Sequence, residues 1–241
     1  MAYGSQPRWT DRSAATRLDI DVGLRDYMLR IYNYMASGLA LTGIVAYVAA
    51  MGGRDSFIAQ IYHTPLMWLV ILAPLGLAMW LSYGINRLSA AAAQGIFWVY
   101  AGLMGLSLST VFLVYTGASI ARVFFITAGT FAAMSLYGYT TRRDLSQMGS
   151  FLFMGLIGIV IASLVNIFLA SSALQFAICV IGVLVFTGLT AWDTQQIKET
   201  YYEGAGYEVA GKQAVMGALR LYLDFVNLFM MLIQLLGVRR D

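Results

Sequence analysis

The sequence predicts an all-α polytopic membrane protein with seven transmembrane helices, and three observations support this class. Of the 241 residues, 60% are hydrophobic and only 11% are charged, and the mean hydropathy is +0.72. Water cannot solvate such a composition as a globule. Apolar runs near twenty residues long recur along the chain, and each can cross ~30 Å of hydrocarbon as a helix. The runs lack the alternation of an outer-membrane barrel.

The seven predicted spans are joined by short connections, which makes sequential spans antiparallel neighbours. The predicted spans are residues 32–51, 66–85, 95–115, 123–139, 151–170, 174–192 and 221–238. Small residues interrupt several of them, for example Gly102, Gly105 and Ser109 in the third span and Gly155 and Gly158 in the fifth. Small side chains let helix backbones approach closely in a membrane. We therefore expect one tightly packed helical bundle.

Three regions are predicted along the chain. Residues 1–31 form an N-terminal segment, and charges alternating with apolar residues over 18–30 predict a short amphipathic surface helix there. Residues 32–238 form the seven-helix membrane domain, and residues 239–241 form a tail. The first apolar run follows about thirty mostly polar residues, so the arrangement of a secretory signal peptide is missing, and we expect the N-terminus to be retained.

The distribution of basic residues predicts the orientation. With alternate connections on alternate sides, the N-terminal side carries Arg8, Arg12, Arg17, Arg25, Arg30, Arg87, Arg142, Arg143, Lys198, Lys212 and Arg220. The opposite side carries Arg54, Arg122, Arg239 and Arg240. Basic residues concentrate on the cytoplasmic side of membrane proteins, so we expect a cytoplasmic N-terminus. Because Arg239 and Arg240 favour that same side, a re-entrant final helix with six crossings stays open as an alternative.

Two acidic residues stand apart from the other ten, which fall in predicted tails or loops. Asp224 lies within the last apolar run, and Asp193 lies where the sixth run ends. A carboxylate is costly in lipid, so Asp224 must face a protein interior or a wet cavity, and such residues commonly have a function. Arg220 is expected to extend to the cytoplasmic interface, which places Asp224 about 6 Å below it, at a depth similar to Asp193.

Two carboxylates brought together outside bulk water cannot both ionise cheaply, so the pair is expected to respond to pH and to attract cations. Ca²⁺ takes six to eight oxygen ligands, more than the two aspartates and Asn227 supply, which favours weak and transient binding, as on a permeation path. The structural alternative is that Asp224 pairs with Arg220 on its own helix and that Asp193 ends its helix against solvent.

Several other classes are disfavoured. The single Cys179 lies in an apolar run and allows no intramolecular disulfide. The net charge of +3 comes from flanking arginines, which predicts membrane orientation and no nucleic-acid partner. The Gly-x-Gly-Asp signature of an intramembrane aspartyl protease is absent, and the last span has no lysine for a retinal Schiff base. Proton-coupled transport fits an intramembrane acid, but inverted repeats are not evident. No enzymatic activity and no cofactor are expected.

Two segments resemble the Bax inhibitor-one family, also called the transmembrane Bax inhibitor motif family. They are AWDTQQIK at 191–198 and ALRLYLDFVNLF at 218–229, and NRLS at 86–89 is similar with less specificity. The similarity covers essentially the whole chain in length and span count. It implies a seven-helix fold with the last helix central. Trp192 stands where other members often carry Tyr or another large residue.

The resemblance also implies a function, a pH-sensitive calcium leak gated by a di-aspartyl pair. By position, Asp193 and Asp224 match the pair that meets the metal ion, and Arg87 matches an arginine that latches the closed state. Apart from the resemblance, Arg220 is expected to be a second gating charge, because it lies one helical turn before Asp224. The long N-terminal segment resembles bacterial members and suggests the inner membrane. The expected partners are the lipid bilayer and Ca²⁺, a permeant ion. The alternative is an interaction protein that modulates a membrane protease or another membrane protein without conducting ions.

Overall fold

The computed structural model describes residues 9–62, 64–202 and 204–240, so residues 1–8 of the predicted N-terminal segment and residue 241 of the predicted tail lie outside the described residues. The described chain is helical, with one isolated β-bridge between Tyr115 and Arg239. The helices are α1 (Trp9–Ala49), α2 (Phe57–Tyr62), α3 (Leu66–Gly84), α4 (Ala90–Val114), α5 (Gly117–Thr140), α6 (Ser146–Leu169), α7 (Ser172–Glu199) and α8 (Tyr207–Leu236). Two 3₁₀ turns, η1 (Gly53–Asp55) and η2 (Ile85–Arg87), lie between them.

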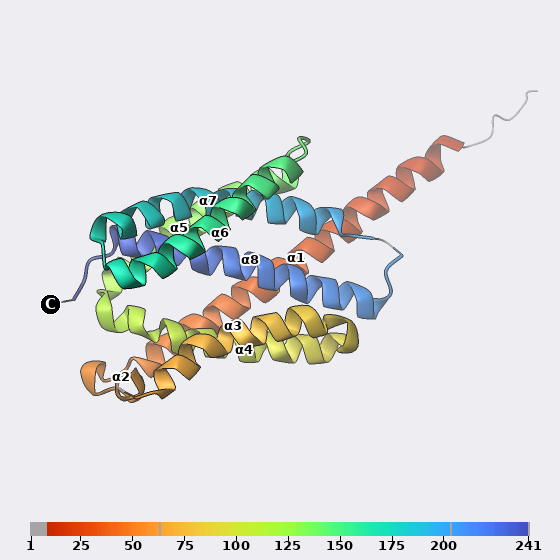
Figure 1. Cartoon of the computed structure of the whole chain (residues 1–241). Helices are drawn as coiled ribbons and strands as arrows, with labels where there is room; N and C mark the ends of the chain where they lie inside the picture. Colours follow the sequence, from red (N-terminus) through yellow and green to blue (C-terminus); the bar gives the residue numbers. More distant parts are fainter. Residues whose placement is uncertain (1–8, 63, 203, 241) are drawn as a thin grey trace, which may run out of the picture.

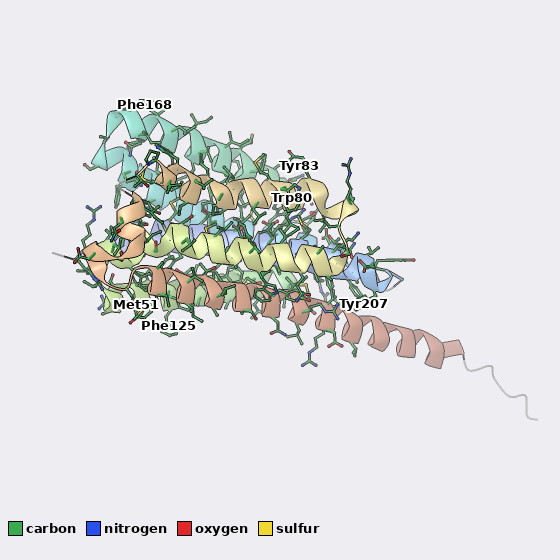
Figure 2. The ribbon with its side chains drawn as sticks, turned by 90° about the horizontal axis from the view of Figure 1, so that it is seen from below. Met51, Trp80, Tyr83, Phe125, Phe168 and Tyr207 are labelled. Atoms are coloured by element: carbon green, nitrogen blue, oxygen red, sulfur yellow. The ribbon has the colours of Figure 1, made fainter. Side chains whose placement is uncertain are left out.

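Seven of the described helices, all except α2, are long and apolar enough to cross a membrane. Neighbouring long helices run antiparallel, and α8 lies in the middle of the bundle (Figure 1). The outside of the bundle carries large apolar side chains that point away from it, such as Trp80, Tyr83, Phe125 and Phe168 (Figure 2). Phe168 is 87% exposed, a position that lipid tolerates and water does not. The predicted all-α polytopic membrane fold with seven transmembrane helices is confirmed.

The two ends of the bundle carry different connections. The η2 turn, the α5–α6 connection and the α7–α8 connection lie at the end from which the first turns of α1 project, called here the N-terminal end (Figure 1). The chain finishes at the opposite, C-terminal end. Because α8 is one uninterrupted helix of 30 residues, it runs the length of the bundle, which supports seven crossings over the re-entrant alternative.

The last helix is central because it packs on α1, α4, α5 and α7. Leu221 and Tyr222 belong to one buried core cluster, and Leu228 and Ile233 belong to a second. Small residues also permit close contacts between other helices, α4 with α1 and α6 with α7, as expected from the sequence. A Cβ on Gly105 would lie 2.7 Å from the carbonyl oxygen of Thr42, and one on Gly155 would lie 3.0 Å from Val185. Gly102 and Gly158 face open space.

Two expectations about the N-terminal side are wrong. The predicted separate surface helix over 18–30 is part of α1, which runs without a break from Trp9 to Ala49. The apolar residues of this stretch pack into the bundle: Tyr27, Met28 and Ile31 are buried. An apolar stripe that finds a protein partner packs into the bundle instead of lying flat on a membrane surface.

The second correction concerns the predicted connection over 193–220. Most of it is helical, because α7 continues to Glu199 and α8 begins at Tyr207. Ala214, Val215, Ala218 and Leu219 are buried, which gives the start of α8 an apolar face despite its polar neighbours. Asp193 therefore does not end its helix. It lies within α7, more than one turn before the last helical residue.

Candidate di-aspartate site

The packing of α7 against α8 brings the two predicted acids together. The carboxyl groups of Asp193 and Asp224 lie within hydrogen-bonding reach of each other. Asp224 is only 5% exposed, and Asp193 is partly buried. The sixth and seventh spans, α7 and α8, therefore touch at this depth, and the two acids share one environment.

One oxygen of the pair has no partner among the described residues. Asp224 Oδ2 is fully buried and accepts no hydrogen bond from any described group. Buried polar atoms are nearly always satisfied, and exceptions commonly mark a functional position. By contrast, the amides near the C-terminal end are satisfied: Asn166 Nδ2 donates to Gln175 Oε1 at 3.0 Å, and Gln175 Nε2 donates to Gln234 Oε1 at 2.6 Å. Asn166 and Gln175 serve as interhelical hydrogen-bonding groups.

Arg220 is the positive charge that acts on both carboxyl groups. It lies one helical turn before Asp224 on α8, and its side chain is exposed. Arg220 also lines a cavity of about 300 Å³ at the N-terminal end, together with Lys212, Asn86 and Tyr27. This cavity lies between α1, η2, α7 and α8, and it brings two cations and several polar groups close to the pair.

Arg87 was predicted as a gating residue, and the fold does not place its side chain beside the aspartate pair as it does Arg220. It ends the η2 turn, and its side chain is exposed. Its neighbours Ile85 and Asn86 line the N-terminal cavity, so the backbone of the turn reaches the cavity wall. In this conformation Arg220 supplies the charge beside the pair. The latch role of Arg87 stays a prediction, and it requires the side chain to turn inward from η2.

A chain of hydroxyl groups beside the pair was not identified from the sequence. The Tyr32 hydroxyl contacts Ser135 Oγ, which lies 2.9 Å from Thr194 Oγ1. Thr194 Oγ1 also contacts the carbonyl oxygen of Thr190 at 2.7 Å. This chain joins α1, α5 and α7 and ends next to Asp193. Isolated Ser and Thr residues in apolar spans are the only signal for it, and that signal is common in membrane helices.

Other charged and titratable groups lie on the helices packed around the pair. Tyr27 on α1 lies near Arg220, and Tyr32 on α1 lies near Tyr139 on α5. On α7, Lys198 Nζ donates to the Tyr139 carbonyl oxygen at 2.8 Å. The described residues contain no cluster of three or more His, Cys, Asp or Glu side chains suited to a metal ion.

Comparisons with known proteins cover nearly the whole chain. A family model described as Inhibitor of apoptosis-promoting Bax1 matches residues 24–241. A protein of Rickettsia prowazekii (strain Madrid E) is 53% identical over 225 residues, covering 92% of this chain and 93% of the relative. Inner membrane protein YbhL of Escherichia coli (strain K12) is 49% identical over 222 residues, covering 90% and 94%. A membrane protein of Streptococcus pyogenes serotype M3 is 36% identical over 217 residues, also covering 90% and 94%.

These matches include the helices that carry Asp193 and Asp224. The family model begins near the start of the membrane-spanning part of α1 and continues through α8. Both the sequence motifs and the seven-helix fold agree with this assignment. The chain therefore belongs to the Bax inhibitor-1 family.

Proposed function

We propose that this protein is a passive, pH-modulated Ca²⁺ leak in which Asp193 and Asp224 form the ion-binding gate. The observation that carries the proposal is the contact between two carboxyl groups inside the bundle, with one oxygen left without a partner. Two carboxylates in contact outside bulk water repel each other, so the pair favours a shared proton or a bound cation. A proton and Ca²⁺ therefore compete for the same oxygens, and the flux depends on pH.

Arg220 and Arg87 are the proposed gating charges. Arg220 acts on both carboxyl groups and lines the N-terminal cavity, so it opposes entry of a cation from that end. Arg87 lies on the turn that forms part of the cavity wall, from which it can pair with Asp193 and close the site. Protonation of the aspartate pair weakens its attraction to Arg220 and to Arg87. One charge change can therefore shift the equilibrium between closed and open states.

The location is proposed to be the bacterial inner membrane, with the N-terminus in the cytoplasm. Seven apolar helices support a multi-pass protein, and the relative YbhL carries inner membrane in its name. The N-terminal end of the bundle holds most of the Lys and Arg residues, which supports the cytoplasmic side.

Ca²⁺ flux into proteoliposomes, measured across pH, tests this function. Asp224→Asn removes one of the two carboxyl groups that share a proton while preserving the shape of the side chain, so we expect the Ca²⁺ flux to lose its pH dependence. Asp144→Asn is the matched control, because Asp144 is exposed in the α5–α6 connection, and it should behave like the wild type. Arg87→Gln should raise the flux, whereas Arg142→Gln, in the same exposed connection as Asp144, should not. An unchanged pH profile in Asp224→Asn would contradict the assignment.

A second candidate is an interaction protein that modulates a membrane protease or another membrane protein. It is supported by the first turns of α1, which begin at Trp9 and project past the other helices at the N-terminal end (Figure 1). Such a projection provides a docking surface and requires no permeation. Deleting the residues before Asp19 separates the two functions. Loss of a partner with unchanged Ca²⁺ flux would support the interaction role as an independent one.

A further inference from the structure

The bundle has a long groove between α1 and α5. α1 packs on α4 and α8, and α5 packs on α7 and α8, while α1 and α5 scarcely approach each other. Two cavities of about 680 Å³ and about 560 Å³ lie between them and share Met35, Ala36 and Phe131 in their walls. We call this continuous space the α1–α5 groove. It extends from Arg25 near the start of the span of α1 to Tyr47 near its end.

The groove is apolar over most of its length and polar at one end. Its floor includes Phe225 of α8, the residue after Asp224. At the N-terminal end the lining contains Arg25, Tyr32, Ser135 and Tyr139. Lys198 adds a second positive charge there, since its ammonium lies 5.3 Å from the centroid of the Tyr139 ring. The shape and polarity therefore match a molecule with a long apolar part and a negatively charged head.

The surroundings of the groove are the second argument. Both α1 and α5 are apolar enough to cross a membrane, and Ala36 and Ala132 on the two rims are exposed. In a bilayer the opening of the groove therefore faces hydrocarbon, and lipid is the molecule present there at high concentration. Arg25 is among the last charged residues of α1 before an uncharged stretch that continues to the end of the helix, so its guanidinium is at the level of lipid phosphates.

We propose that the α1–α5 groove binds an anionic phospholipid of the surrounding bilayer, with one acyl chain along the groove and its phosphate paired with Arg25. The apolar wall supplies the contact area for the chain, and the guanidinium can donate two hydrogen bonds to phosphate oxygens. The bound chain covers the small parts of Phe131 and Phe225 that line the groove; the rest of each side chain is buried in the bundle. This site rests on the groove and its charges and does not depend on Ca²⁺ permeation.

Native mass spectrometry of the full-length protein tests the site. The protein is reconstituted in nanodiscs with equal amounts of phosphatidylglycerol, phosphatidylethanolamine and oleic acid, then released in mild detergent. Ala132→Trp fills the groove, whereas Ala133→Trp places the same bulk on the neighbouring exposed position, which does not line it. We expect the wild type and Ala133→Trp to retain one phosphatidylglycerol each and Ala132→Trp to retain none.

A second pair of variants tests the head-group contact without changing the packing. Arg25→Gln should weaken retention of phosphatidylglycerol by about tenfold, because a charge-assisted hydrogen bond is lost. Arg30→Gln, on the same helix but outside the groove, should retain it fully. Equal retention by Ala132→Trp and Ala133→Trp would overturn the proposal. So would retention of oleic acid, of phosphatidylethanolamine, or of a second copy of the chain in place of phosphatidylglycerol.

Discussion

At the scale of single residues, buried polar side chains join helices wherever they find partners. Thr42 on α1 donates to the Ala101 carbonyl oxygen of α4 at 2.8 Å and contacts the Tyr222 hydroxyl of α8 at 2.7 Å. Such bonds specify which helix faces meet, because an unpaired polar group in this interior is costly. Asp224 Oδ2 is buried without such a partner. Tyr100, Thr187 and Trp192 also have a buried polar atom without a partner, but Asp224 is the carboxyl group among these four, and it lies beside a second carboxyl group.

A residue-scale prediction concerns the tight connection between α6 and α7. Ala170 has φ of 49°, the left-handed conformation that glycine adopts without a steric penalty. Ala170→Gly should therefore stabilise the protein by about 1 kcal/mol, whereas Ala173→Gly, in the first turn of α7, should destabilise it by a similar amount. The thermal midpoint of unfolding in detergent measures both. A lower midpoint for Ala170→Gly would show that the strain is absent.

At the scale of helix pairs, close backbone approach determines where the sites lie. A Cβ on Gly138 of α5 would overlap the Ala191 carbonyl oxygen of α7, which is two residues before Asp193. The same α5–α7 contact holds Ser135 beside Thr194. On its other side α7 packs on α6, where a Cβ on Gly149 would overlap the Trp192 ring. Asp193 therefore lies on a helix held from two sides, which leaves its carboxyl directed toward α8.

The element-scale prediction tests this contact. Gly138→Ala forces α5 and α7 apart, because the obstructing atom belongs to the backbone and cannot rotate away. We expect a loss of about 1–3 kcal/mol in the free energy of unfolding, as for other overpacked interiors. Gly129→Ala, on the same helix with nothing within 4 Å, is the control and should be neutral or slightly stabilising. Denaturation in mixed detergent micelles gives both values, and equal stabilities would refute the close contact.

At the scale of the whole molecule, seven crossings place the termini at opposite ends. The C-terminal strap, residues 237–240, is fastened to the α4–α5 connection: the Thr116 amide donates to the Val238 carbonyl oxygen at 3.0 Å, and the Arg240 amide donates to the Val114 carbonyl oxygen at 2.8 Å. At the other end, Glu208 Oε2 accepts a hydrogen bond from the Ala90 amide at 2.8 Å, which joins the starts of α8 and α4. Both ends of the central helix are thus held.

Cysteine labelling in intact cells checks the orientation. Native Cys179 is buried and should stay silent, so single cysteines can be introduced without a removal step. Gln60→Cys in α2 lies toward the C-terminal end, and Gln147→Cys at the start of α6 lies toward the N-terminal end; both positions are exposed. A membrane-impermeant maleimide should label Gln60→Cys directly and Gln147→Cys only after permeabilisation. The reverse pattern would invert the proposed orientation, and equal labelling would contradict the three crossings, α3, α4 and α5, between the two positions.

Helix boundaries were predictable only where apolar composition marks them. The predicted run 66–85 corresponds closely to α3, and the start of the run at residue 174 lies close to the start of α7, because hydropathy alone separates a span from its connection at these points. The starts of α1 and α8 were missed, since charged residues alternate with the apolar stripe that packs into the bundle. Alternation of this kind fits a surface helix and a buried amphipathic helix equally well, and only the presence of neighbours distinguishes them.

By itself, the sequence determined the membrane class and the number of spans, and it singled out the two acids that the fold brings together, because each follows from the cost of placing residues in hydrocarbon. The tertiary structure alone decided that Asp193 lies inside α7 and contacts Asp224, that Arg220 rather than Arg87 is the charge beside them in this conformation, and that a groove separates α1 from α5. These facts depend on which helix faces meet. Close packing of small residues sets those faces, and hydropathy does not record it.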